Sequence, residues 1–402
     1  MRMRSHLFRA AAFALMFGNA LLAQDLAGDW QGTLHAGVRD LRMIVRIAGS
    51  AGARTEFAIK TTSDCADCEF QLGAGSWTQG APLPLELTRA TPENAWKDPA
   101  THAVQFVSVE NNVRLEVLEL GGSGRPLVLL TGLGNPAHVF DKFAPKLTAT
   151  YHVYGISRRG YGLSSAPASG YSADRLGDDV LAVIDALKLD RPVLAGHSIA
   201  GEELSSIASR HPEKVAAMIY LDAGYSYAYF DPSVRGHGSL AFDLTDLQKK
   251  LEQLVQGKGP SDPRSLIQEL LNTILPDFEK DLAETEKDYD AMPPAMLTGG
   301  PTPAVVQAIL EGEQRYTKLP VPILAIFAIP YQMGPGSDKG SAVLSEFEVR
   351  DEIATEAQVK AFANGVPSAR VVRLPHANHY IFLSNETDVL REMNAFIGAL
   401  HE

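Results

Sequence analysis

The sequence has very little cysteine and lacks a long run of basic residues. Only two of its 402 residues are cysteines, Cys65 and Cys68, and their spacing favours a local disulfide in an oxidising compartment. A zinc site would need two more ligands, and no obvious ones stand near this pair. No long basic run accompanies the formal net charge of −12, which argues against nucleic acid as a partner. We therefore predict neither a metal nor a cofactor.

An apolar run long enough to cross a membrane is also missing, because a span needs about 20 residues. The nearest candidate covers residues 10–22 and follows Arg2, Arg4 and Arg9. A basic start, a short apolar run and a small residue such as Ala23 are typical of a secretory signal peptide. We expect residues 1–23 to be removed near Ala23 and the protein to be exported, either to the periplasm or out of the cell. An uncleaved N-terminal anchor is the alternative.

Residues 25–100 predict a small β module followed by a linker. The stretch 41–47 is β-branched and roughly alternating, as in a strand, and residues 83–89 predict another strand. The motifs Trp30-Gln31-Gly32-Thr33-Leu34 and Trp77-Thr78-Gln79-Gly80 resemble a module found ahead of catalytic domains in exported bacterial proteins. Prolines within residues 91–99 predict the linker.

From residue 103 onward, predicted strands alternate with predicted helices, which indicates an α/β fold with a mainly parallel sheet. The alternation stops at residue 230 and resumes at residue 321. The segment between, residues 230–318, is helical, acidic and without a strand pattern, so we interpret it as an insertion. Strands are expected at residues 114–120, 126–130, 151–156, 192–195, 215–222, 321–327 and 370–374, and helices at residues 174–188, 350–363 and 386–400.

A serine at a strand-to-helix junction is the most informative local pattern. The sequence Gly196-His197-Ser198-Ile199-Ala200-Gly201 follows an apolar run and precedes residues with helical spacing. Small residues two positions before and after a serine permit the sharp turn of a nucleophile elbow, and the helix then directs its first amides at the site. An ordinary small-residue turn in any α/β protein has the same pattern, so other motifs must show whether Ser198 is a nucleophile.

With these motifs in order, residues 103–402 resemble the α/β-hydrolase fold, with helices on both faces of the sheet and a helical cap inserted after the strand that follows the elbow. The resemblance implies Ser198 as the nucleophile and His379, in the loop before the last helix, as its base. His376 is the rival base. Asp222, at the end of the strand after the elbow helix, is the favoured acid, and Asp338 is the alternative. The acid would hold the histidine in the right tautomer and stabilise its cation.

The resemblance also implies an oxyanion hole, in which backbone amides lie about 3 Å from the charge that develops. Ile199 supplies one amide because it directly follows the serine. Leu133 supplies the other from the glycine-containing loop after the strand at residues 126–130. Members of the family usually begin this loop with His-Gly, whereas Thr131 stands at the histidine position here.

Other side chains beside these motifs have two interpretations each. Glu202 and Glu203 begin the helix after the elbow, where acidic residues suit the helix dipole, and either could also contact a substrate. Tyr225 and Tyr227 follow the favoured acid, and His138 follows the oxyanion loop. These three residues either line a substrate pocket or pack in the interior.

A serine nucleophile suits acyl transfer to water and argues against the relatives that use aspartate, such as haloalkane dehalogenases and epoxide hydrolases. We therefore expect a serine carboxylic-ester hydrolase that forms an acyl-enzyme and acts on a small-molecule ester. Alternatives with the same triad are an aminopeptidase, a C–C bond hydrolase and a perhydrolase. A non-catalytic binding protein on this fold is the alternative of another class. The sequence predicts neither the identity of the substrate nor the oligomeric state.

Overall fold

A computed structural model describes the chain at residues 28–36, 39–50, 55–62, 85–89, 102–234, 239–257, 262–292, 303–329 and 346–400, the first four of these as backbone strands. The predicted signal peptide, Cys65, Cys68 and Asp338 lie outside these ranges. Within them, every helix is too short or too polar to cross a membrane. Contacts divide the chain into two compact units, with one boundary between Ala100 and Thr101.

The N-terminal unit contains a four-stranded antiparallel sheet. Its strands are β1 (Gly28–Ala36), β2 (Arg39–Ser50), β3 (Thr55–Thr62) and β4 (Leu85–Arg89), in the spatial order β3-β2-β1-β4. The central strand β1 pairs with β2 on one side and with β4 on the other. Strands therefore occupy the region in which the sequence predicts a β module.

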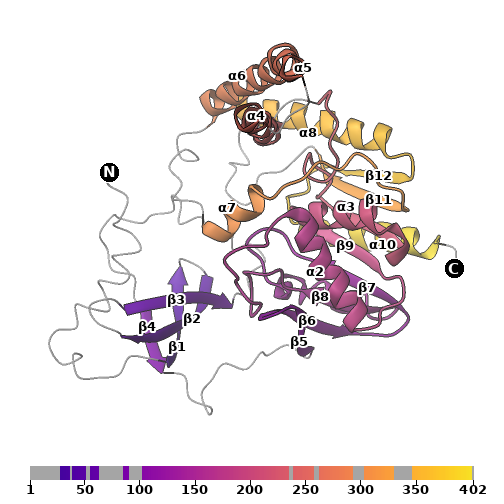
Figure 1. The fold of residues 1–402 in the computed structure, drawn as a ribbon. Coiled ribbons are helices and arrows are strands. Elements are labelled where there is room, and N and C mark those ends of the chain that lie inside the picture. Colours follow the sequence, from indigo (N-terminus) through magenta and orange to yellow (C-terminus); the bar gives the residue numbers. More distant parts are fainter. Residues whose placement is uncertain are drawn as a thin grey trace. The chain divides into compact units, whose positions relative to one another are not determined.

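The second unit is built on an eight-stranded sheet in the order β12-β11-β10-β9-β7-β8-β6-β5, labelled in Figure 1. The strands from β7 to β12 pair in parallel, and β5 and β6 are antiparallel. The strands are β5 (Ala103–Glu110), β6 (Val113–Gly121), β7 (Arg125–Leu130), β8 (Tyr151–Ile156), β9 (Val193–His197), β10 (Ala217–Leu221), β11 (Ile323–Ala328) and β12 (Ala369–Leu374).

Both faces of this sheet are buried under helices, which explains why its central strands are continuous apolar runs. Val128 of β7 belongs to a buried cluster with Ile184 of α2 (Ala173–Ala186) and Leu204 of α3 (Ala200–Arg210). The next residue, Leu129, is equally buried and points to the opposite face, because side chains alternate along a strand. Helix α10 (Glu386–Gly398) packs against β11. The mainly parallel sheet with helices on both faces is confirmed.

Helices fill the segment between β10 and β11, where the sequence predicts an insertion. They are α4 (Ser239–Gln256), α5 (Pro263–Glu269), the π-helical turn η4 (Leu270–Ile274), α6 (Leu275–Ala291) and α7 (Ala304–Leu310). Helices α4 and α6 contact each other, and α6 contacts α8 (Glu346–Gly365), as Figure 1 shows near the top of the view. Arg350 of α8 pairs with Asp288 of α6 at 2.8 Å, which ties the insertion to the helix that follows β11.

Helix α7 of the insertion packs against the elbow region. Its Ile309 is fully buried in a small apolar cluster with Tyr171, Leu176 and Ile199. Leu133 packs against the same cluster. The insertion thus covers the two residues whose amides the sequence assigns to an oxyanion hole.

Candidate active site

Ser198 occupies the turn between β9 and α3 with a left-handed backbone. Its φ is +54°, a conformation that costs a non-glycine residue roughly 1–3 kcal/mol. The turn is held by two backbone hydrogen bonds: Ser198 N donates to Leu221 O at 3.3 Å, and Gly201 N donates to Ser198 O at 2.9 Å. The strained turn lifts the hydroxyl out of the sheet edge, as the elbow pattern predicts.

Two glycines permit the close approaches around this turn. A Cβ atom on Gly201 would lie 2.0 Å from the carbonyl oxygen of Ala223, so a side chain there would collide with backbone. A Cβ atom on Gly132 would lie 2.7 Å from Nδ1 of His197 and 3.2 Å from Cβ of Ser198. The loop after β7 therefore lies directly against the serine turn, and glycine makes this contact possible.

His379 lies between the hydroxyl of Ser198 and a buried carboxylate. Its Nε2 atom is 2.8 Å from Oγ of Ser198, and its Nδ1 atom is 2.8 Å from Oδ2 of Asp222. The rival His376 is exposed, in a left-handed turn with φ of +60°, and three residues earlier in the same loop. The structure thus brings together the first-choice serine, histidine and aspartate of the sequence analysis.

Asp222 is fully buried at the end of β10, and hydrogen bonds surround its carboxylate. Oδ1 accepts a hydrogen bond from the backbone N of Ala328, at 2.9 Å, and another from the hydroxyl of Tyr225, at 3.0 Å. Oδ2 remains for His379. Donors on Oδ1 fix the carboxylate plane, so Oδ2 accepts the Nδ1–H of His379 and leaves Nε2 free to accept a proton.

His197, the residue before the serine, holds the loop that carries His379. Its Nε2 donates a hydrogen bond to the carbonyl oxygen of His379 at 2.9 Å, and the two rings lie 4.6 Å apart between centroids. Burial lowers the pKa of His197 well below its usual value, and the neighbouring His379 lowers it further. His197 is therefore neutral and acts as a hydrogen-bond donor rather than as a second base.

The predicted oxyanion residues contact the same small apolar cluster. Ile199 begins the turn into α3, and Leu133 belongs to the loop that contacts Ser198 through Gly132. In the turns and loops of the described ranges, neither the backbone N–H of Ile199 nor that of Leu133 donates to another backbone carbonyl. Asn135 of the same loop donates from Nδ2 to the hydroxyl of Tyr380 at 3.0 Å, which links this loop to the loop of His379.

The α/β-hydrolase fold family model matches residues 125–386, which is more than half of the chain. The chain belongs to the α/β-hydrolase fold family. The matched range runs from β7 to the start of α10 and includes Ser198, Asp222 and His379.

Several curated members of the family match parts of the chain. The 2-(acetamidomethylene)succinate hydrolase of Mesorhizobium japonicum is 24% identical over 147 residues, which are 36% of this chain and 53% of that protein. Epoxide hydrolase A of Mycobacterium tuberculosis is 35% identical over 115 residues, which are 28% of this chain and 36% of that protein. The crystal structure of E-2-(acetamidomethylene)succinate hydrolase covers 74% of this chain and all of that one, at 18% identity and a TM-score of 0.47.

The aligned segments span about half of these curated relatives or less. The likeness therefore concerns the fold, and the activity of this chain has to be argued from its own residues.

Two acidic residues of the elbow helix have different surroundings in this α/β-hydrolase. Glu203 forms a buried ion pair with Arg158 at 2.5 Å, and the same guanidinium donates from Nη2 to the carbonyl oxygen of Thr131 at 2.9 Å. Arg158 thus holds the start of the loop after β7, at the position where Thr131 replaces the family's usual histidine. Glu203 is an interior ion-pair partner.

Glu202 is fully buried, and neither of its carboxylate oxygens has a hydrogen-bond partner among the described residues. Burial raises the pKa of Glu202 well above its usual value, and the nearby Glu203 and Glu313 raise it further. Burial also raises the pKa of Glu313 to about 7. Glu313 follows α7, so its approach to the elbow helix depends on how the insertion folds and gave no signal in the sequence.

Two tyrosines that follow Asp222 in the sequence contact residues of the candidate triad. Tyr225 donates to Asp222, as described above, and the side chain of Tyr227 lies beside Ser198. Burial raises the pKa of Tyr227 well above its usual value, so its hydroxyl stays protonated at neutral pH. His138 differs from both, because carboxylates rather than apolar side chains surround it.

Proposed function

We propose that this chain is a serine carboxylic-ester hydrolase that works through an acyl-enzyme. The observation that supports the proposal is the alignment of three groups, in which His379 is 2.8 Å from both the Ser198 hydroxyl and the Asp222 carboxylate. A serine hydroxyl needs such a base within hydrogen-bond reach to act as a nucleophile. A serine at the elbow distinguishes the proposed chemistry from that of family members that attack with aspartate.

In the proposed reaction, Nε2 of His379 takes the proton of Ser198 while Oγ attacks the ester carbonyl carbon. Asp222 stabilises the imidazolium that results. The amides of Ile199 and Leu133 donate to the oxyanion, and its collapse breaks the ester bond as His379 gives its proton to the leaving alcohol. A water molecule then attacks the acyl group in the same way, which releases the acid and restores Ser198.

A fluorophosphonate probe and short p-nitrophenyl esters test the proposal. The folded chain should react covalently with the probe at Ser198, and Ser198→Ala should abolish both labelling and ester turnover. The matched control is Ser209→Ala, on the same helix, which should change neither. Turnover that survives Ser198→Ala would reject Ser198 as the nucleophile. A folded parent chain that neither reacts with the probe nor turns over esters would favour a non-catalytic binding protein.

The other reactions of the same triad are distinguished by a substrate panel. Esters, peptides with a free N-terminus, β-diketones and lactones are compared at equal concentration, and peroxide is added to the ester assay to detect a perhydrolase. The proposal expects the highest kcat/KM for esters. Faster cleavage of a peptide or of a C–C bond would assign the triad to that class.

Export is a second part of the proposal. It rests on the basic residues, the short apolar run and the small residues of positions 1–23. Expression of the full gene in a Gram-negative host, followed by fractionation and intact-mass measurement, should find the chain in the periplasm or the medium, shortened near Ala23. A full-length chain in the cytoplasm or membrane fraction would contradict it.

A further inference from the structure

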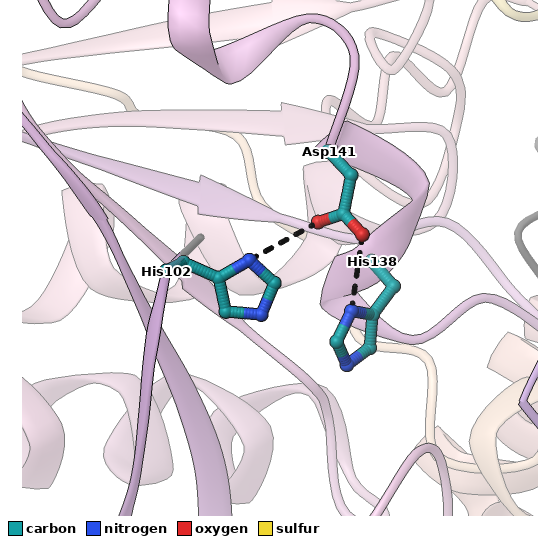
Figure 2. A group of neighbouring side chains, drawn as sticks. All are labelled: His102, His138 and Asp141. Carbon is teal, nitrogen blue, oxygen red and sulfur yellow. Dashed lines mark hydrogen bonds and ion pairs between the residues drawn. The ribbon is translucent and has the colours of Figure 1, made fainter. Parts of the chain in front are cut away.

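Two histidines and an aspartate from distant parts of the hydrolase unit converge beside β5 (Figure 2). His102 directly precedes β5, His138 belongs to the short helix η1 (Ala137–Phe140), and Asp141 ends that helix. Nδ1 of His138 is 3.2 Å from Oδ2 of Asp141, and Nδ1 of His102 is 3.7 Å from Oδ1. One ligand atom from each residue lies within 4.8 Å of the other two.

The three side chains are largely buried, yet the carboxylate between them is not fully satisfied. The exposed fractions are 4% for His102, 15% for His138 and 23% for Asp141. Oδ1 of Asp141 is inaccessible to solvent and has no hydrogen-bond partner among the described residues. Such an oxygen costs free energy unless a cation or a donor compensates it.

A second carboxylate lies behind His138, on the side away from Asp141. Nε2 of His138 is 3.8 Å from Oε1 of Glu116, which is 1% exposed. Glu116 is anchored at its other oxygen, Oε2, which accepts hydrogen bonds from the hydroxyl of Ser157 at 2.7 Å and from the backbone N of Leu163 at 3.2 Å. Metal-binding histidines usually donate their second ring N–H to a carboxylate in this position.

We propose that His102, His138 and Asp141 form a binding site for a divalent transition-metal ion, with Zn²⁺ as the best-suited ion. Imidazole nitrogen and carboxylate oxygen are ordinary zinc ligands at about 2.0–2.2 Å, which places ligand atoms of a tetrahedral site roughly 3.3 Å apart. The two histidine nitrogens lie 3.2 and 3.7 Å from different oxygens of Asp141, and one ligand atom from each residue lies within 4.8 Å of the others, so small side-chain shifts would bring them to that spacing. Water would occupy the fourth position, and Glu116 would orient His138.

Without a metal, the same groups form an ion-pair network. The two ring nitrogens of His138 face the carboxylates of Asp141 and Glu116, at 3.2 and 3.8 Å. A bound ion replaces the proton on Nδ1 of His138. The ion would connect the segment before β5 to η1, and η1 directly follows the loop that carries Leu133. We therefore assign the site a stabilising role, independent of ester hydrolysis.

Titration calorimetry with ZnCl₂ tests the proposal on the whole chain, after treatment with a chelator. Cys65→Ser and Cys68→Ser are introduced first, so that thiolates cannot account for binding. One zinc ion should bind per chain, and its melting temperature should rise. His102→Ala and Asp141→Asn should each weaken binding at least about 100-fold, and Glu116→Gln should weaken it about 10–100-fold. His211→Ala, a histidine beside Glu213 elsewhere on the surface, is the control and should leave affinity unchanged.

His102→Ala is the decisive variant, because it leaves the contact between His138 and Asp141 in place and is the change least able to prevent folding. Absence of zinc binding by the parent chain would overturn the proposal and leave the ion-pair network as the correct description. Unchanged affinity in both His102→Ala and Asp141→Asn would also overturn it. MgCl₂ should give no comparable binding, since Mg²⁺ prefers oxygen ligands. Equal binding of both ions that is insensitive to His102→Ala would exclude the histidines as ligands.

Discussion

Nδ1 of His379 lies 2.8 Å from Oδ2 of Asp222, across 157 positions of sequence. Asp222 itself has a left-handed backbone, with φ of +49°, and its own N–H donates to the carbonyl oxygen of Ile326 at 2.7 Å. Residues of the neighbouring strand β11 therefore hold Asp222 in place: Ile326 accepts from its backbone N–H, and the backbone N of Ala328 donates to its carboxylate. This arrangement selects the tautomer in which Nε2 carries no proton and faces Ser198.

Replacing this carboxylate by an amide should remove the tautomer selection. We expect Asp222→Asn to lower kcat for p-nitrophenyl esters roughly 10⁴-fold with a small change in KM, because the amide can donate to Nδ1 and favours the wrong tautomer. Asp338→Asn, the second candidate from the sequence, is the control and should keep kcat within about twofold of the parent. The reverse pattern would transfer the role to Asp338.

The hydroxyl of Tyr225 supports the same carboxylate from its other oxygen. Tyr225→Phe removes one hydrogen bond to a charged group, worth about 1.5–3 kcal/mol, while Ala328 N continues to donate. We expect kcat to fall by roughly tenfold and the fluorophosphonate reaction to slow in parallel. Tyr229→Phe, from the same segment, is the matched control. Equal activity of the two variants would mean that Ala328 alone holds Asp222.

The sequence predicted the sheet well because its central strands are buried on both faces. Apolar runs such as residues 323–328 have no polar alternation, and their positions differ from the expected ones by a few residues at most. The choice between Asp222 and Asp338 was harder. The choice depends on which strands end side by side at the same edge of the sheet. The strand order β9-β10-β11 places the C-terminal end of β10, and thus Asp222, next to the elbow.

The rest of the site could not be found from spacing alone. At the end of β11, where the family usually has its acid, the backbone N of Ala328 donates to Asp222 instead, and a backbone donor has no sequence signature. Glu313 approaches the elbow helix from the insertion. The cluster of His102, His138 and Asp141 joins residues that lie far apart in the sequence, at the start of β5 and at η1. It therefore has no local sequence motif, and the sequence analysis predicts no metal.

The ion pair of Arg158 and Glu203 offers a test of interior electrostatics. Both side chains are less than 5% exposed, so Glu203→Gln leaves an uncompensated buried charge and should cost about 3–5 kcal/mol in urea unfolding. Arg158→Met with Glu203→Leu should cost less than Glu203→Gln alone, because neither charge remains. Glu356→Gln, which breaks a surface pair with Arg373, should cost less than about 1 kcal/mol. Additive losses in the double variant would contradict the buried pairing.

The raised pKa of Glu313 predicts how stability depends on pH. Its folded pKa of about 7 exceeds the usual value of 4.5, so the folded state binds more protons between these values and stability falls as pH rises through that window. Glu313→Gln removes this contribution. The free energy of unfolding of the variant relative to the parent should therefore increase from pH 4.5 to 7, by no more than about 1.4 kcal/mol per pH unit, and then level off. For Glu311→Gln, the control, the difference in unfolding free energy from the parent should not change with pH. A difference that is equally independent of pH for Glu313→Gln would refute the assignment.

The left-handed backbone of Ser198 predicts that the nucleophile lowers the stability of the protein. Glycine adopts a φ of +54° without steric cost, so Ser198→Gly should release strain and raise the free energy of unfolding by roughly 1 kcal/mol, after the larger entropy of glycine in the unfolded chain is deducted. Ser198→Ala keeps the strained backbone and loses the same hydroxyl, which makes it the matched control. Both variants should be inactive toward esters, and the glycine variant should be the more stable in urea unfolding. Equal stability of the two would mean that the turn stores no strain and that its geometry serves the reaction at no cost to the fold.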